Sequence, residues 1–259
     1  MKELSCFTTY DIRGKINVNI DTEIVYRVGR ALSQHFEAKS VVIGYDARET
    51  SPTFASAIAK GIIDSGSNVI NIGLAGTEEM YWAVSEFGAC AGVEVTASHN
   101  PINYNGIKIV KSKSQPLHEE IDLKAIKKLA ETETFSTPKY SGTATDRSVE
   151  ARKAYVDRVI SFVDIKKLRS LKIVVNSGNG AAGPTFDAIA KKLSKENAPL
   201  EFIRINHRPD HKFPNGVPNP ILPKNHYATA EVVRDVGADL GVAFDGDFDR
   251  CFFFDENGT

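Results

Sequence analysis

Three aspartates, Asp245, Asp247 and Asp249, stand at alternate positions in the stretch GVAFDGDFDR, directly after an apolar segment typical of a buried strand. Carboxylates this close repel one another unless a cation compensates their charge. A hard cation with oxygen ligands suits such a group, and Mg²⁺ suits it best. It takes few carboxylates and leaves coordination positions for a phosphate oxygen. The loop therefore predicts a Mg²⁺ site.

Acidic loops of similar spacing also occur in unrelated classes of protein. A calcium-binding EF-hand is excluded because Arg250 stands where the sharp turn needs glycine, and the apolar run 251–254 follows. A phosphatase of the haloacid-dehalogenase type stays open, with Asp245 as its nucleophile, although Asp249 stands where that pattern has Thr or Val. An acidic turn between two strands also stays open, since turns often carry Asp and Gly.

A second polar loop, in the stretch VEVTASHNPINYNG at 93–106, places Ser98 beside His99 just after a strand. Serine is a weak nucleophile unless it is activated. Neighbouring side chains on an extended chain point in opposite directions, so we expect no Ser–His dyad here. The loop is either simply polar or presents Ser98 as the carrier of a phosphoryl group. In the second case a cation at the acidic loop would neutralise one phosphate oxygen.

The elements that must position these loops follow a repeated strand–helix pattern. Apolar segments at 39–46, 67–73 and 89–98 alternate with helical patterns at 51–66 and 76–88. After a stretch rich in Thr, Ser, Pro and Gly at 131–148, strands are expected at 171–176, 200–206, 238–246 and 251–254, and helices at 149–163, 181–194 and 227–237. This alternation predicts an α/β fold with two consecutive domains, residues 1–145 and 146–259, each a mostly parallel mixed sheet between helices.

Two details of this prediction concern helix starts and the location of the site. Ser51 is expected to cap the helix at 51–66, with Pro52 at its first position, and Thr77 is expected to cap the helix at 76–88. Ligands of open α/β sheets bind outside the carboxyl ends of the strands. Ser98 and the acidic loop both follow such ends, so we expect them to share one site.

The composition limits the class of protein. The chain has 259 residues, is 42% hydrophobic and 25% charged, and carries a formal net charge of -1. Such a balance favours neither nucleic acid nor an anionic membrane as partner. Three widely spaced cysteines indicate no disulfide framework and no metal-ligand spacing. No signal peptide and no membrane-spanning run are recognisable, so the expected location is the cytoplasm.

The two loops together carry a resemblance to a known family. TASHNP at 96–101 and DGDFDR at 245–250 resemble the α-D-phosphohexomutase superfamily, and within it the bacterial phosphomannomutases. Four further stretches match in the same order: YDIRG at 10–14, NYNGIKIV at 103–110, NSGNGAAGP at 176–184 and FPNGVPNP at 213–220. The resemblance runs from near residue 5 to the end, and GTEEMY at 76–81 favours the phosphomannomutase branch over the phosphoglucosamine branch.

The resemblance implies a role for each matching residue. Ser98 would be the phosphoserine and a further ligand of a Mg²⁺ held by the three aspartates, with no organic cofactor. Arg13 and Arg250 would hold the phosphoryl group, which suits the planar, permanently charged guanidinium. Lys108 would handle the proton of the reacting hydroxyl, and His99 would line the site.

The resemblance also implies a reaction. A phosphomannomutase interconverts mannose 6-phosphate and mannose 1-phosphate through a phosphoserine and a 1,6-bisphosphate intermediate, primed by a sugar bisphosphate. Its product feeds GDP-mannose synthesis. The small-molecule partner would be a hexose phosphate, and glucose phosphates are possible substrates as well.

The sequence departs from the family at its end. Family members have four domains, whereas Thr259 lies where a third would begin. The family's sugar-recognition loop and phosphate-clamp loop have no match, which predicts a truncated chain. Two hypotheses result: an incomplete phosphomannomutase, or a non-catalytic two-domain remnant that binds Mg²⁺ without turning over sugar. The run 251–254 would form an exposed edge, which predicts some self-association.

Overall fold

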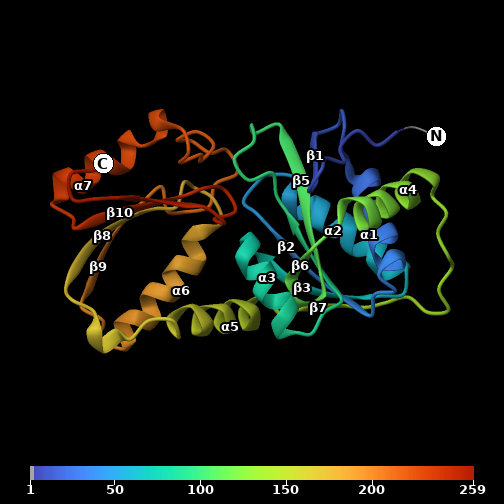
Figure 1. Cartoon of the computed structure of the whole chain (residues 1–259), viewed down its shortest axis with the longest axis horizontal. Helices are drawn as coiled ribbons and strands as arrows, with labels where there is room; N and C mark the ends of the chain where they lie inside the picture. The colour runs from blue at the N-terminus through green and yellow to red at the C-terminus, as the bar shows by residue number, and fades with distance from the viewer. Residues whose placement is uncertain (1–2) are drawn as a thin grey trace.

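The computed structural model describes residues 3–259 and shows two α/β lobes side by side (Figure 1). The first lobe is built on a seven-stranded sheet with the order β1-β5-β4-β2-β3-β7, in which β6 pairs with β5. Strands β4, β2, β3 and β7 run parallel, and β1, β5 and β6 are joined by antiparallel pairs. The strands are β1 (Ile12–Lys15), β2 (Ser40–Tyr45), β3 (Asn68–Leu74), β4 (Ala91–Val95), β5 (Tyr104–Lys111), β6 (Gln115–Pro116) and β7 (Ala144–Asp146).

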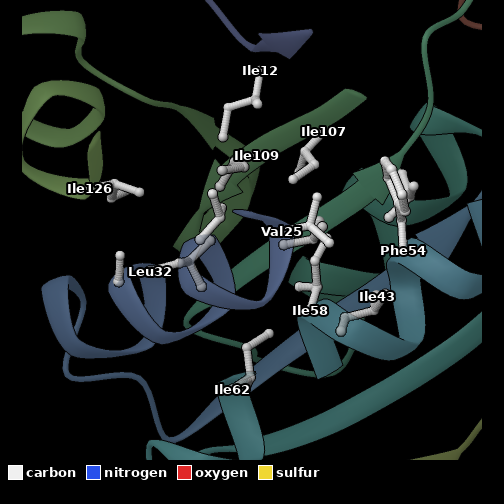
Figure 2. Packing of buried hydrophobic residues seen from close by; sticks show 14 of the residues in the cluster. Ile12, Val25, Leu32, Ile43, Phe54, Ile58, Ile62, Ile107, Ile109 and Ile126 are labelled. Atoms are coloured by element: carbon white, nitrogen blue, oxygen red, sulfur yellow. The ribbon is translucent and has the colours of Figure 1, made fainter. Parts of the chain in front are cut away.

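Helices cover both faces of this sheet because its central strands are apolar on both sides. In β2, Val41 and Ile43 pack into one core while Val42, between them, packs into the other. The larger core is covered by α1 (Thr22–His35), α2 (Ser51–Asp64) and α4 (Lys124–Thr132), and Figure 2 shows side chains from α1, α2 and the strands meeting in it. The opposite core is covered by α3 (Thr77–Glu86) and α5 (Ser148–Ile160).

The second lobe has a four-stranded sheet with the order β11-β10-β8-β9. Its parallel strands are β8 (Leu171–Asn176), β9 (Leu200–Ile205) and β10 (Leu240–Phe244), and β11 (Cys251–Phe254) pairs antiparallel with β10. Helices α6 (Ala182–Lys195) and α7 (Tyr227–Val236) complete this lobe. The predicted fold class, two α/β units with mostly parallel mixed sheets flanked by helices, is therefore confirmed.

Helix α5 belongs to the packing of both lobes. Its residue Ala151 lies in the core of the first lobe with α3, whereas Val156 and Ile160 pack with Leu193 of α6. In Figure 1 the helix runs along the lower side of the molecule from one lobe to the other. The segment 131–148, rich in Thr, Ser, Pro and Gly, contains β7, which pairs with β3. This short strand was missed because its residues lack an apolar pattern.

Two expected helix caps were wrong by one residue. Thr50 occupies the cap position of α2, and the hydroxyl of Ser51 donates instead to Asp46 at 2.6 Å. Gly76 occupies the cap position of α3, where the Glu79 carboxylate accepts a hydrogen bond from its backbone N–H at 3.1 Å. Both displaced side chains have polar partners outside their helix. In the part of the chain that the structure describes, no helix is long and apolar enough to cross a membrane.

Candidate active site

Two loops meet between the two lobes. The serine loop carries Ser98 and lies within residues 93–106, and the acidic loop carries the three aspartates at 245–250. Ser98 follows β4, Asp245 follows β10, and the Ser98 hydroxyl donates to Oδ2 of Asp245 over 2.6 Å. The backbones are equally close, because a Cβ atom on Gly246 would lie 2.6 Å from the Ser98 carbonyl oxygen. Only glycine fits this contact, so the two stretches that the sequence placed at separate strand ends form one site.

Ser98 has a left-handed backbone conformation, with φ of 50°, and is fully buried. Its N–H donates to the Thr96 hydroxyl at 2.7 Å. This turn brings the Ser98 hydroxyl to 3.2 Å from Nδ1 of His99. The expectation that these two side chains point apart was wrong, because it assumed an extended chain.

Arg250 links the groups around Ser98. Its Nη2 donates to the Ser98 hydroxyl at 2.6 Å and to Asp245 at 2.7 Å, and it also contacts Nδ1 of His99. Burial and the charges of Arg250 and Arg13 lower the pKa of His99. Since His99 Nδ1 faces a guanidinium, it is poorly placed to take a proton from Ser98.

The three aspartates form a compact acidic cluster, in which one carboxylate oxygen of each residue lies within 4.8 Å of one oxygen of each of the others. Lys108 of β5 contacts two of them, with Nζ at 2.6 Å from Asp247 and 2.6 Å from Asp249. Burial and the neighbouring Asp247 raise the pKa of Asp245. Burial alone would raise the pKa of Asp247, but Lys108 lowers it below its ordinary value. Burial alone would lower the pKa of Lys108, but the two carboxylates raise it.

The cluster has the donor set of a hard-cation site. Among residues 3–259, the Oδ1 atoms of Asp247 and Asp249 find no hydrogen-bond partner although both atoms are buried. A buried carboxylate oxygen without a partner is costly unless a cation or water satisfies it. Carboxylate oxygens are the ligands that Mg²⁺ prefers, so the residues present fit that ion.

Arg13 reaches the serine loop from β1 and contacts its backbone. Its Nη1 donates to the Ala97 carbonyl at 3.0 Å and contacts the Asn100 side chain, while its Nε pairs with Asp11 at 2.8 Å. The structure thus gathers Ser98, His99, Lys108, Arg250 and the acidic cluster directly, and places Arg13 against the loop that carries Ser98.

Arg48 was missed from the sequence although it supports the serine loop most extensively. Its guanidinium donates to the backbone carbonyls of Ser98 at 2.9 Å, Asn100 at 2.6 Å, and Pro101 and Tyr104 at 3.0 Å each. Arg48 is buried, and burial lowers its pKa while Asp46 opposes that effect. The only signal in the sequence is its place after a buried strand, where Asp46 and Arg48 follow Tyr45.

Asp46 connects this arginine to the strand ends. It accepts hydrogen bonds from the hydroxyls of Thr96 at 2.8 Å and Ser51 at 2.6 Å, and pairs with Arg48 at 3.4 Å. These bonds fix the start of the serine loop before any ligand arrives. The buried ion pair of Asp46 and Arg48 therefore supports the backbone around Ser98.

The Ser98 hydroxyl, Arg250 and the acidic cluster thus lie together at the carboxyl ends of two α/β sheets, and two family models match the chain. The model for phosphoglucomutase/phosphomannomutase alpha/beta/alpha domain I matches residues 5–137, and that for domain II matches residues 153–258. The chain belongs to the phosphoglucomutase/phosphomannomutase family.

Three individual proteins show what the chain is similar to within and beyond this level of family. The chain is 45% identical over 258 residues to a phosphomannomutase of Escherichia coli K12, covering 100% of this chain and 57% of the relative. A Burkholderia thailandensis phosphoglucomutase/phosphomannomutase family structure is 31% identical, with a TM-score of 0.88, covering 100% of this chain and 56% of that one. An Aspergillus fumigatus N-acetylphosphoglucosamine mutase, in complex with GlcNAc-6P and magnesium, shares the fold at 15% identity and a TM-score of 0.53, over 99% and 52% of the chains.

Proposed function

We propose that the chain carries the phosphoryl-transfer machinery of a phosphomannomutase, which interconverts mannose 6-phosphate and mannose 1-phosphate. The observation that carries this proposal is the Ser98 hydroxyl, held between Asp245 and Arg250 at 2.6 Å from each and adjoining the acidic cluster. The 45% identity to a bacterial phosphomannomutase favours mannose phosphate over other hexose phosphates.

The proposed roles follow the chemistry of each group. Ser98 exchanges a phosphoryl group with O1 or O6 of the sugar: the bond from phosphorus to the Ser98 oxygen breaks as the bond to the sugar oxygen forms. The proton that leaves the sugar hydroxyl is matched by the proton that the Ser98 oxygen regains, so the exchange is balanced. Lys108, an ammonium between two carboxylates, is proposed to relay this proton, giving one to the Ser98 oxygen and taking the one from the sugar hydroxyl. Arg250 and Arg13 neutralise the transferring group, and His99 lines its pocket.

The acidic cluster is proposed to hold Mg²⁺ through Asp245, Asp247 and Asp249, with phosphorylated Ser98 as a further ligand. A bound Mg²⁺ supplies charge neutralisation and alignment of the phosphate oxygens. The donor set supports this assignment, and a fungal mutase of the same fold is described with magnesium. A sugar 1,6-bisphosphate is proposed as primer, and mannose 1-phosphate would serve GDP-mannose synthesis.

The division of the chain into two domains, residues 1–145 and 146–259, is also a proposal.

The chain spans about 57% of the length of the curated relatives that it matches. In a second candidate function, the two domains bind Mg²⁺ and accept phosphate but do not turn over sugar. Binding of remote substrate groups supplies orientation and transition-state stabilisation, so turnover depends on more contacts than phosphate acceptance does.

One experiment separates the two candidates. Phosphorus NMR of the purified chain with mannose 6-phosphate, Mg²⁺ and a trace of sugar bisphosphate is compared with the Ser98→Ala variant. Mannose 1-phosphate formed only by the chain with Ser98 supports the mutase. A phosphoserine signal without conversion supports the binding protein. If Ser98→Ala gains the same phosphoryl signal as the parent, both candidates are wrong.

A further inference from the structure

Thr77, the first residue of α3, is fully buried and contacts the acidic loop of the other lobe. Its hydroxyl donates to Oδ2 of Asp247 at 2.6 Å, and its backbone N–H donates to the Asp247 carbonyl at 3.1 Å. The two residues are 170 positions apart in the chain. The next residue of the loop, Phe248, packs over Gly76, where a Cβ would lie 2.3 Å from the ring. The start of α3 is therefore shaped to receive the acidic loop.

The two oxygens of Asp247 have different surroundings. Oδ2 accepts hydrogen bonds from Thr77 and from Lys108 at 2.6 Å each, whereas Oδ1 is buried without a partner among the described residues. Thr77 and Lys108 thus occupy one oxygen and leave the other for a cation. Lys108 has a flexible four-carbon side chain, whereas Thr77 has a short side chain at the start of a helix. Thr77 therefore restricts the orientation of the Asp247 carboxylate more than Lys108 does.

The backbone of Thr77 is itself held in place. Glu79 caps the N–H of Gly76 at 3.1 Å, and Arg152 of α5 lies 3.4 Å from Glu79 and contacts the carbonyl of Leu74. Asp247 is therefore supported through Thr77 by the packed elements of the first lobe. Such outer contacts set the orientation of a ligating carboxylate and its affinity for the ion.

We propose that Thr77 is a positioning residue of the cation site, which fixes Asp247 from the opposite lobe and leaves its Oδ1 to bind the ion. The proposal rests on the proposed function, because it takes Asp247 as a cation ligand. It assigns a role to the GTEEMY segment, and it makes cation affinity depend on the contact between the lobes.

The test is a titration of the whole chain with Mn²⁺, a probe for oxygen-ligand sites, with free Mn²⁺ measured by electron paramagnetic resonance. Thr77→Val removes the hydroxyl at nearly constant shape, and we expect the Kd for Mn²⁺ to rise about 10-fold or more. Thr77→Ser keeps the hydroxyl, and we expect a Kd within about 3-fold of the parent, since the donor remains.

Thr229→Val is the matched control. Thr229 is also a fully buried helix residue, and its hydroxyl accepts a hydrogen bond from Asn176 at 2.9 Å away from the acidic loop. Its loss should leave the Kd unchanged. Far-ultraviolet circular dichroism verifies folding, and Thr77→Ala replaces Thr77→Val should the latter not fold.

Asp247→Asn separates failure of this inference from failure of the proposed function. If Asp247→Asn weakens Mn²⁺ binding and Thr77→Val does not, the positioning role is wrong while the cation site stands. The role is equally wrong if Thr229→Val weakens binding as much as Thr77→Val. If Asp247→Asn binds Mn²⁺ like the parent, the cation site itself is wrong.

Discussion

Ser98 and Asp245 share a hydrogen bond of 2.6 Å although they lie 147 positions apart in the chain. The bond joins the loop after β4 in one lobe to the loop after β10 in the other, and Arg250 donates to both side chains. Any change that moves the two loops apart should therefore act on both residues at once.

Gly246→Ala tests the close approach of the loops. The added Cβ would meet the Ser98 carbonyl at 2.6 Å, so the loops must separate. We expect a loss of about 1–3 kcal/mol in the free energy of unfolding, as for overpacked sites, and weaker Mn²⁺ binding. Urea denaturation and the Mn²⁺ titration measure these two effects.

Gly88→Ala is the control for this substitution. Gly88 has a φ of 61° and no atom within 4 Å of an added Cβ. The Gly88→Ala variant should lose about 1 kcal/mol of its free energy of unfolding through backbone strain alone, and its affinity for Mn²⁺ should not change. Unchanged stability and affinity in Gly246→Ala would show that the loops are not in contact.

Arg48→Met should destabilise the protein strongly. It removes the donor to four carbonyls of the serine loop and leaves Asp46 buried without its partner. Removing one member of a buried ion pair costs about 3–5 kcal/mol, and urea denaturation measures the loss.

Two further variants interpret that loss. Arg169→Met breaks an exposed pair with Asp239 and should cost less than about 1 kcal/mol. Adding Asp46→Asn to Arg48→Met should recover part of the stability, because the uncompensated buried charge is gone. A loss no greater than that of Arg169→Met would contradict the supporting role of Arg48.

Asp122 predicts a dependence of stability on pH. Burial raises its pKa, but hydrogen bonds from His35 at 3.0 Å, the His118 N–H at 2.8 Å and Lys111 at 3.1 Å lower the pKa overall to about 2 from 3.8. Because the pKa of Asp122 is lower in the folded state, its ionised carboxylate stabilises the protein at pH values above the pKa of the unfolded chain. This stabilisation is lost as the pH falls toward 2.

The free energy of unfolding of Asp122→Asn should therefore be about 1–2 kcal/mol lower than that of the parent at pH 6. This difference should shrink between pH 4 and pH 2. Denaturation at a series of pH values measures both chains. Glu150→Gln, which alters an exposed pair with Arg147, is the control with little expected difference. A gap between parent and Asp122→Asn that stays constant to pH 2 would refute the ionic role of Asp122.

Strand β11 predicts self-association. It lies at the edge of the second sheet, and its residue Phe253 is 71% exposed. Exposed apolar edges favour pairing with another chain. Sedimentation velocity should show concentration-dependent association of the parent and its reduction by Phe253→Lys. A monomer at every concentration tested would disprove this prediction.

The fold and the general place of the site were predictable from local patterns. The strand–helix alternation identified β2, β3 and β4 of the first sheet and the four strands of the second, but not β1, β5, β6 and β7. The rule that ligands bind at carboxyl ends of parallel strands brought Ser98 and Asp245 together. Family models confirm the resemblance, whereas the catalytic roles of Ser98, Lys108 and Arg250 stay predictions.

The missed features depend on contacts between distant segments. The left-handed turn at Ser98, which points its hydroxyl toward His99, reflects how the loop packs over Arg48 and not a local propensity. Thr77 fits a helix cap in the sequence, but its hydroxyl bonds to Asp247 in the other lobe. No periodicity within one element carries information about such partners.

The burial of Arg48 has a consequence for the field at the serine. Its guanidinium carries a permanent positive charge behind the Ser98 carbonyl, out of contact with bulk counterions. Dissolved salt screens exposed charges over about 8 Å at physiological ionic strength but reaches buried charges much less. Because Asp46 pairs with this guanidinium, the field that reaches Ser98 is that of a buried ion pair and not of a lone charge, and rising salt concentration does not remove it. The dipole of this pair is already oriented before any ligand binds.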